Sequence, residues 1–311
     1  MTVFAEVFSD HRLFNTVTIM LRRFLGGVLV CLTVGCTAWA QPKVPDGVVY
    51  EADVEYGKGG DESLKLDIAR PEKVSEAAPC IVVIHGGGWR AGNRKQHVDA
   101  ILALAKQGYI AATISYRFAP KHAFPAQIED AKCAVRFLRA NAEKYQLDPE
   151  RIGAVGFSAG AHLSMLLGTM DKDDGMEGEG GHADQSSKVQ CVVAFFGPTD
   201  FLADDIPEQV VGLVDDLVGA TREEKPELRK AASPVTYVSS GDAPTLIYQG
   251  TKDVLVPHTQ AYKMADALSK AGVPGRVELL LGAGHGWGGA EMMRTLEGTT
   301  KFFAAELKNG K

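Results

Sequence analysis

Short apolar segments alternate along most of this chain with segments that have the spacing of amphipathic helices, and this alternation limits the fold more than any other feature. The helical spacing is clearest over residues 126–145. Buried strands separated by helices are typical of an α/β fold, in which a mostly parallel sheet carries helices on both faces. The expected strands are 64–68, which alternates with period two and should be antiparallel, 80–84, 109–115, 152–157, 189–195, 245–249 and 277–281; the expected helices are 97–107, 126–145, 159–169, 260–272 and 290–308.

Two segments interrupt this alternation. Residues 171–188 are rich in Asp, Glu and Gly, which predicts a solvated loop. Their aspartates do not complete the alternating oxygen spacing of a calcium loop, so we favour solvent exposure over a metal site. Residues 201–232 have a helical, alternately charged sequence and lie where a small cap could cover a site. Neither segment is expected to form a separate domain.

The first forty residues differ from the rest of the chain. Two arginines precede an apolar run over residues 24–34, and a small-x-small sequence follows at residues 38–40. These features are typical of a secretory signal peptide, and the run is shorter than the roughly 20 residues of a membrane span. We expect translation to begin at Met20 and export to remove everything through Ala40, which gives a secreted or periplasmic protein. A lipoprotein site at Cys36 and a buried apolar helix are the alternatives.

The remaining residues, 41–311, suit one catalytic domain with a large core. The formal net charge of the full chain is −6, which argues against a nucleic-acid or anionic-membrane partner. Cys80, Cys133 and Cys191 have apolar neighbours, which favours buried thiols over a disulfide framework, although one bridge stays open. The oligomeric state is also open.

A serine occupies the boundary between an expected strand and an expected helix, in the sequence Gly156-Phe157-Ser158-Ala159-Gly160. A sharp turn there needs small neighbours, and it would present the serine oxygen above the edge of the sheet. The start of the following helix would also direct its positive end toward developing negative charge. Ser158 is therefore the candidate nucleophile, with an incidental serine in a glycine-rich turn as the alternative.

The second motif is His85-Gly86-Gly87-Gly88-Trp89, which directly follows the expected strand 80–84. Acyl transfer needs backbone N–H groups directed at the oxyanion of the tetrahedral intermediate, and glycines allow the backbone to approach it closely. We assign Gly87 and Gly88 as donors, together with the N–H group of Ala159. His85 is expected to be a structural hydrogen-bonding residue rather than a base.

The candidate base follows the last expected strand, in Gly282-Ala283-Gly284-His285-Gly286-Trp287. Glycines on both sides would let the imidazole reach the serine. The main rival is His162, but its position one helical turn beyond Ser158 should direct it away from the serine oxygen. We therefore expect His285 to act as the base.

The candidate acid follows the preceding expected strand. Asp253 comes after residues 245–249, so it should leave the same edge of the sheet and accept a hydrogen bond from His285. The chain order of serine, acid and histidine is that of the α/β-hydrolases. Asp200 is the rival acid, although it follows an earlier strand, and an ordinary surface aspartate is the alternative for Asp253.

These motifs together resemble the bacterial esterases related to hormone-sensitive lipase, and more closely the bifunctional feruloyl and acetyl xylan esterase group. The resemblance covers about residues 48–308 and rests on His-Gly-Gly-Gly-Trp, Ser115-Tyr116-Arg117, Phe124-Pro125 with Asp130, Gly-Phe-Ser-Ala-Gly-Ala-His, and the segments around Asp253 and His285. It implies an eight-stranded α/β-hydrolase without a cofactor. It also implies Ser158 as nucleophile, Asp253 as acid, His285 as base, and Gly87, Gly88 and Ala159 as oxyanion donors. Nothing before residue 60 resembles the longer N-terminal cap of the lipase branch, which argues against long-chain lipid substrates.

The resulting hypothesis is a serine carboxylesterase that acts through an acyl-enzyme. Its substrates would be short-chain acyl or aromatic esters, such as acetyl or feruloyl groups on plant-derived carbohydrate. Trp89 and Trp287 lie within the catalytic motifs, so they could form an aromatic wall for substrate or else pack beneath the loops. The alternatives are a serine peptidase of the prolyl-oligopeptidase type and a non-catalytic binding module. The natural ester stays open.

Overall fold

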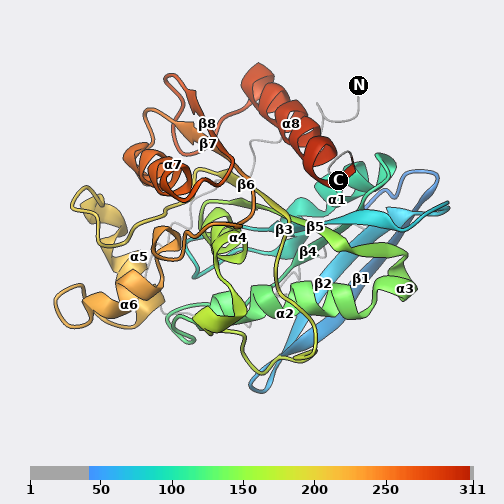
Figure 1. The fold of residues 1–311 in the computed structure, drawn as a ribbon, viewed down its shortest axis with the longest axis horizontal. Helices are drawn as coiled ribbons and strands as arrows, with labels where there is room; N and C mark the ends of the chain where they lie inside the picture. Colours follow the sequence, from blue (N-terminus) through green and yellow to red (C-terminus); the bar gives the residue numbers. More distant parts are fainter. Residues whose placement is uncertain (1–41, 309–311) are drawn as a thin grey trace, which may run out of the picture.

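The computed structural model describes residues 42–308, which form one eight-stranded sheet with helices on both faces (Figure 1). The expected signal peptide, with Met20 and Cys36, lies outside these residues. Within them, no helix has the length and hydrophobicity needed to cross a bilayer. In sheet order the strands are β1 (Val48–Gly59), β2 (Glu62–Pro71), β4 (Ile110–Ile114), β3 (Ala78–Ile84), β5 (Leu147–Phe157), β6 (Cys191–Phe195), β7 (Thr245–Gly250) and β8 (Gly275–Leu280).

The sheet is mostly parallel, as the alternating sequence pattern predicts. Strands β1 and β2 pair antiparallel, β2 pairs antiparallel with β4, and every later pair is parallel. In the register of β3, Ile84 lies between Ile114 of β4 and Gly156 of β5. The loops that follow β3 and β5 therefore leave the sheet side by side, which brings the two glycine-rich motifs together.

Strand β3 shows how the two faces of the sheet are filled. Its side chains alternate between two hydrophobic clusters: Val82 and Ile84 belong to one, Ile81 and Val83 to the other. A strand buried on both faces is apolar throughout, which explains the continuous apolar run. One face is covered by α1 (Val98–Lys106) and α8 (Gly289–Phe303), and the other by α2 (Ala126–Ala140), α3 (Ala142–Tyr145), α4 (Ala159–Thr169) and α7 (Thr259–Ala271).

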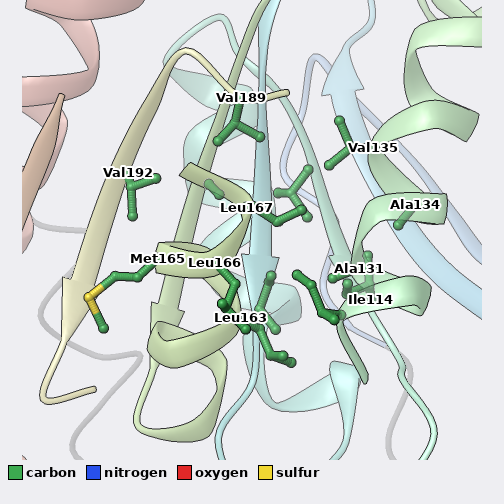
Figure 2. Close-up of a cluster of buried hydrophobic side chains, with 14 of the residues drawn as sticks. Ile114, Ala131, Ala134, Val135, Leu163, Met165, Leu166, Leu167, Val189 and Val192 are labelled. Atoms are coloured by element: carbon green, nitrogen blue, oxygen red, sulfur yellow. The ribbon is translucent and has the colours of Figure 1, made fainter. Parts of the chain in front are cut away.

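Helix α4, which follows the candidate nucleophile, lies in the larger cluster. Figure 2 shows its side chains Leu163, Leu166 and Leu167 between the sheet and α2, with Met165 directed toward β6. Almost every residue of α4 is buried, so the helix is held on all sides rather than along one stripe. This packing fixes the position of the residue at its N-terminus.

Strand β1 is not predicted by the sequence pattern. The pairing of β1 with β2 shifts register between Glu51 and Val54 and again between Glu55 and Gly57. Such irregularities interrupt the period-two alternation by which a strand is detected. Part of the strand is also exposed, which further weakens its hydrophobic pattern. The expected helix 126–145 is broken at Asn141, between the end of α2 at Ala140 and the start of α3 at Ala142. Helix α3 then ends at Tyr145, because Gln146 has a positive φ of 58°.

The prediction of a solvated loop for residues 171–188 is wrong in part, because half of this segment packs on α2. Lys132 of α2 is buried, and its Nζ lies 2.9 Å from the carbonyl oxygen of Gly175 and 2.9 Å from Glu177. Arg136, also buried, forms a 2.6 Å ion pair with the same glutamate. Buried cations require such partners, so Glu177 of the acidic segment neutralises the two buried cations of α2.

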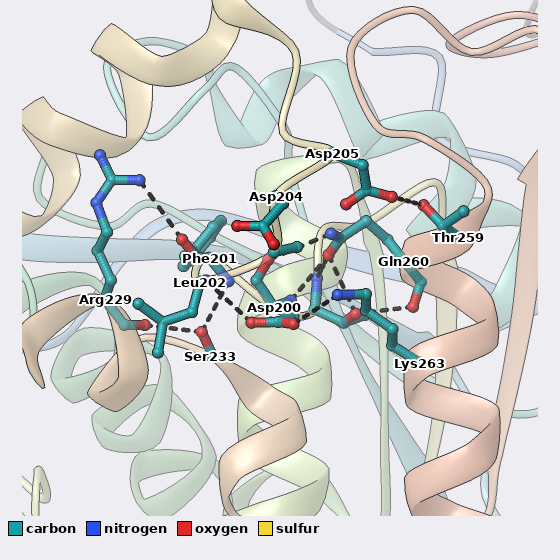
Figure 3. A network of polar contacts seen from close by, with 12 residues as sticks. Asp200, Phe201, Leu202, Asp204, Asp205, Arg229, Ser233, Thr259, Gln260 and Lys263 are labelled. Atoms are coloured by element: carbon teal, nitrogen blue, oxygen red, sulfur yellow. Dashed lines mark hydrogen bonds and ion pairs between the residues drawn. The ribbon is translucent and has the colours of Figure 1, made fainter. Parts of the chain in front are cut away.

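The insertion between β6 and β7 contains two helices, α5 (Glu208–Val218) and α6 (Pro226–Ala231), as expected for residues 201–232. The start of the insertion is tied to α7, and its end is tied to its start (Figure 3). At its start, Oε1 of Gln260 accepts the N–H groups of Thr199 and Asp200 at 2.8 Å. At its end, Oγ of Ser233 accepts the N–H group of Phe201 at 2.9 Å. The insertion therefore forms a closed loop with a fixed base.

The three cysteines of the described residues, Cys80, Cys133 and Cys191, are buried free thiols. The aspartates at 171–174 form a short capping box, in which Asp171 and Asp174 exchange hydrogen bonds with each other's backbone. These side chains are therefore used within the loop itself.

Candidate active site

Ser158 lies at the turn between β5 and α4, above the carboxyl edge of the sheet. Its backbone has φ 53° and ψ −119°, a conformation that is costly for any residue with a Cβ. The turn is held because its N–H group donates to the carbonyl oxygen of Phe195 at 2.9 Å. A Cβ on Gly160 would lie 2.1 Å from the carbonyl oxygen of Ile84, so the helix start fits against β3 only with glycine there.

His285 joins the serine to the acid. Its Nε2 lies 2.9 Å from Oγ of Ser158, and its Nδ1 lies 2.8 Å from Oδ2 of Asp253. An ionised carboxylate only accepts hydrogen bonds, so Nδ1 carries the proton and Nε2 is free to accept the serine hydroxyl proton. The structure thus brings together the three side chains that the sequence selected, from loops 95 and 32 residues apart.

Asp253 is held by more than the histidine. Its side chain is fully buried, its Oδ1 accepts the N–H groups of Leu255 and Val256 at 2.9 Å, and its Oδ2 accepts Nε2 of Gln249 at 3.1 Å. Burial alone would raise the pKa of this carboxyl, but the hydrogen bonds from His285 and the backbone outweigh it and hold the pKa below its usual value. The group is therefore a fixed carboxylate.

The rival residues lie elsewhere. His162 is fully buried, and its two ring nitrogens contact Trp89 and the carbonyl oxygen of Ala232. The carboxylate of Asp200 faces Lys263 at 2.9 Å and the N–H group of Leu202 (Figure 3). Neither side chain takes part in the contacts of Ser158 or His285.

His85 has a structural position, as the sequence indicates. Its ring stacks on Tyr116 with centroids 4.5 Å apart, and its Nδ1 lies 2.8 Å from the carbonyl oxygen of Gly86. Burial lowers the pKa of His85 to about 4, so the ring is neutral at pH 7. Its contact with Gly86 supports the start of the glycine loop.

The glycine loop turns tightly beside Ser158. The carbonyl oxygen of Gly87 accepts the N–H groups of Arg90 and Ala91, and Gly87 and Gly88 have φ values of 121° and 58°. Among the hydrogen bonds of residues 42–308, the amides of Gly87 and Gly88 donate none. Ala159 begins α4, where amides have no partner within the helix. All three amides are thus available for an anion.

A cavity of about 690 Å³ opens beside Ser158 and His285. Its wall includes the glycine loop, Phe157 and Phe196, and three aliphatic side chains of α5, namely Val210, Leu213 and Val214. The insertion therefore covers the site, as its position in the sequence indicates. A second hollow of about 790 Å³ lies between α1 and α8, away from these residues.

Helix α5 is bound to the loops on both sides of the cavity. Arg90, which follows the glycine loop, pairs with Asp216 and also donates to the carbonyl oxygen of Gly212. On the other side, Nε2 of Gln209 donates to the carbonyl oxygen of Val254, next to the candidate acid, at 2.6 Å. The cap thus contacts the loops that carry the candidate donors and the candidate acid.

The two tryptophans of the motifs have different positions. Trp89 borders the cavity but is only 4% exposed, and its indole N–H group donates to His162. Trp287 packs against Phe195 and Phe196 and donates to Oγ1 of Thr295 at 3.0 Å. It is not among the residues that line the cavity. The geometry therefore favours packing beneath the loops, which the sequence left open.

Three residues of the site escaped sequence analysis. Gln249 is the next-to-last residue of β7 and donates to Asp253, and the ring of Phe196 lies in a T-shaped arrangement with His285, with centroids 4.7 Å apart. His97 lines the cavity and stacks on Phe157. Only Gln249 carried a signal, because a polar residue at the end of a buried apolar strand needs a partner.

Comparison with known proteins agrees with this architecture. The model of the family described as BD-FAE matches residues 66–268. The chain belongs to the BD-FAE family. Esterase LipC of Mycobacterium tuberculosis is 35% identical over 238 residues, which cover 74% of this chain and 58% of LipC. This BD-FAE chain therefore spans little more than half the length of that relative.

Two solved structures resemble this BD-FAE chain over most of its length. A truncated carbohydrate esterase from gut microbiota matches with a TM-score of 0.75 and 30% identity, covering 84% of this chain and 96% of that one. An acetyl ester-xyloside bifunctional hydrolase from Caldicellulosiruptor lactoaceticus matches with a TM-score of 0.65 and 29% identity, covering 78% and 86%. The expected α/β-hydrolase fold and the resemblance to this esterase group are confirmed.

Proposed function

We propose that this protein is a serine carboxylesterase. The observation that carries the proposal is the pair of contacts made by His285, at 2.9 Å to Ser158 and 2.8 Å to Asp253. A hydroxyl, an imidazole and a carboxylate in this order can activate the oxygen for attack on a carbonyl carbon. The free amides of the glycine loop beside them supply the second requirement, a place for negative charge.

In the first half of the proposed reaction, Nε2 of His285 accepts the hydroxyl proton of Ser158 while Oγ attacks the ester carbonyl. The carbonyl oxygen becomes an oxyanion, which the N–H groups of Gly87, Gly88 and Ala159 stabilise. Asp253 stabilises the imidazolium that forms. The carbon–oxygen bond to the alcohol then breaks, the alcohol takes the proton from Nε2, and the acyl group stays on Ser158.

In the second half, water replaces the alcohol. Nε2 of His285 accepts a proton from the water as its oxygen attacks the acyl carbon, and a second oxyanion forms in the same place. When that intermediate collapses, the bond to Oγ breaks and the serine regains its proton from His285. The carboxylic acid leaves, and the enzyme returns to its starting state without a cofactor.

We propose short-chain acyl and aromatic esters, including acetyl and feruloyl esters of plant-derived carbohydrate, as the substrates. The cavity of about 690 Å³ has an apolar wall of aliphatic and aromatic side chains, which suits an acyl group. The similar solved structures include a carbohydrate esterase and an acetyl ester-xyloside hydrolase. Both observations support a small or aromatic acyl group on a sugar.

Covalent labelling tests the chemistry. A fluorophosphonate probe should attach to the wild-type protein at Ser158, as located by mass spectrometry of its peptides, and should not label a Ser158→Ala variant. A protein that resists labelling and hydrolyses no ester would be a binding module instead. Initial rates on acetyl-xylan, methyl ferulate and p-nitrophenyl esters of increasing chain length then test the substrate class. Faster hydrolysis of esters longer than eight carbons than of acetate would contradict it.

A further inference from the structure

His162 occupies an unusual position for a histidine outside the proposed triad. It lies one turn along α4 from Ser158, it is fully buried, and both of its ring nitrogens are engaged. Nδ1 receives the indole N–H group of Trp89 at 3.2 Å, and Nε2 lies 2.7 Å from the carbonyl oxygen of Ala232. One ring thus joins the nucleophile helix, the glycine loop and the end of the insertion.

These two partners fix the protonation of the ring. An indole N–H group only donates, and a carbonyl oxygen only accepts. Nδ1 of His162 must therefore be bare and Nε2 must carry the single proton. A cationic ring would have no lone pair for Trp89. Burial lowers the pKa of His162 to about 4, which keeps the ring neutral at pH 7, and the two hydrogen bonds then fix its tautomer.

Trp89 needs this anchor because its backbone is strained. Its φ is 57°, a left-handed value that is uncommon for a large side chain. The indole is held edge-on by His162 and Phe201, with centroids 5.3 Å and 5.6 Å away. Trp89 directly follows Gly88, so an anchored Trp89 side chain holds the peptide unit that joins the two residues and thereby restrains the glycine loop before it.

We infer that His162 is a positioning residue for the oxyanion loop, which it holds in place by accepting the hydrogen bond of Trp89. The inference rests on the proposed function, because an oxyanion must form for the loop position to matter. Oxyanion donors act only when they are directed at the place where charge develops. Loss of the anchor would therefore lower turnover and leave the binding of the uncharged ester nearly unchanged.

Two variants separate the two hydrogen bonds of the ring. His162→Asn keeps an oxygen near the position of Nδ1, so it can still accept from Trp89 but no longer reaches Ala232. His162→Gln places its amide near the position of Nε2, so it can still donate to Ala232 but no longer accepts from Trp89. Trp89→Phe removes the same bond from the other side and retains an aromatic ring.

Steady-state kinetics on p-nitrophenyl acetate, with thermal unfolding of each variant, provide the test. We expect kcat to fall about 10-fold or more in His162→Gln and in Trp89→Phe, with KM within about twofold, because misdirected donors reduce transition-state stabilisation. His162→Asn should retain kcat within about threefold of wild type, even if it is the less stable variant. The kcat of the double variant Trp89→Phe/His162→Gln should fall no further than that of either single variant, because the two substitutions remove the same hydrogen bond.

The result that overturns the inference is equal kcat in the Asn and Gln variants, or kcat values that follow their unfolding temperatures. Additive losses in the double variant would overturn it as well. These outcomes differ from failure of the proposed function, in which the wild-type protein itself would neither hydrolyse the ester nor react with the fluorophosphonate.

Discussion

A Cβ atom on Gly156 would lie 2.1 Å from the carbonyl oxygen of Gly160. The last residues of β5 and the first turn of α4 therefore touch through backbone alone. This contact closes the turn around Ser158 and explains the glycine at position 156, whereas the carbonyl oxygen of Ile84 requires glycine at position 160. The geometry of the nucleophile depends on the absence of two side chains.

Gly156→Ala should consequently destabilise the protein by about 1–3 kcal/mol, because the methyl group forces backbone apart. Ester hydrolysis should fall at least 10-fold, since Ser158 would move relative to His285. Urea unfolding and initial rates on p-nitrophenyl acetate measure the two effects. Gly212→Ala is the matched control: this exposed glycine of α5 has nothing within 4 Å of an added Cβ, so stability should hold or rise slightly.

Replacing the candidate acid should separate catalysis from folding. In Asp253→Asn the side chain can still accept the N–H groups of Leu255 and Val256, but its amide would no longer fix the proton of His285 on Nδ1. We expect kcat to fall about 10³- to 10⁴-fold and the unfolding temperature to change little. Hydrolysis at a near-wild-type rate would show that another group orients the histidine.

Acid should weaken the fold before it protonates the carboxylates. Burial lowers the pKa of His85 to about 4, of His97 to about 3 and of His162 to about 4, whereas an unfolded histidine titrates near 6.5. Between these values the unfolded chain binds more protons, so stability is complete above about pH 6.5 and is lost as the pH falls toward 4.

Thermal unfolding at pH 7.5 and pH 5.0 tests this dependence. The midpoint should be lower by about 5 °C or more at pH 5.0. His162→Asn has one buried imidazole fewer, so its midpoint should depend less on pH than that of the wild type. A midpoint that stays constant or rises on acidification would contradict the prediction.

The cap should control the acyl chain that the cavity accepts. Leu213 of α5 lines the cavity and lies 3.3 Å from the position of a Cβ on Gly88. Leu213→Ala should remove apolar contacts with longer chains and reduce the preference for p-nitrophenyl butyrate over acetate, in kcat/KM, by about 3- to 10-fold. Val211→Ala on the same helix, which does not line the cavity, should leave the ratio unchanged.

Much of the sheet could be predicted because its strands are buried on both faces. Strands such as β3 and β6 are entirely buried, so their sequences are uninterrupted apolar runs between helices. Strand β1 was missed because its bulges and partial exposure remove that signal. The segment 171–188 was misjudged because Lys132 and Arg136, the cations it pairs with, are distant in sequence.

The candidate site was predictable where a residue type that catalysis needs directly follows an expected strand. Ser158, Asp253 and His285 each follow a strand, and in a parallel sheet such ends converge on one edge. The partners of His162 could not be predicted in this way. Trp89 and Ala232 lie 73 and 70 residues from it; the adjacent ends of β3 and β5 bring Trp89 near, but the path of the insertion that brings Ala232 to α4 has no signal in the sequence.

The closed base of the insertion has an evolutionary consequence. Residues 199–201 are fastened to Gln260 and Ser233, so the stretch between them begins and ends at fixed points outside the sheet. Positions of this stretch that do not contact the catalytic loops can therefore change without moving β6, β7 or the reacting groups. New substrate ranges could thus arise within this one stretch. Laboratory libraries at the cavity-lining positions Val210 and Leu213, with Gln209 and Asp216 retained for their contacts with the catalytic loops, should yield altered selectivity while the hydrolytic machinery stays intact.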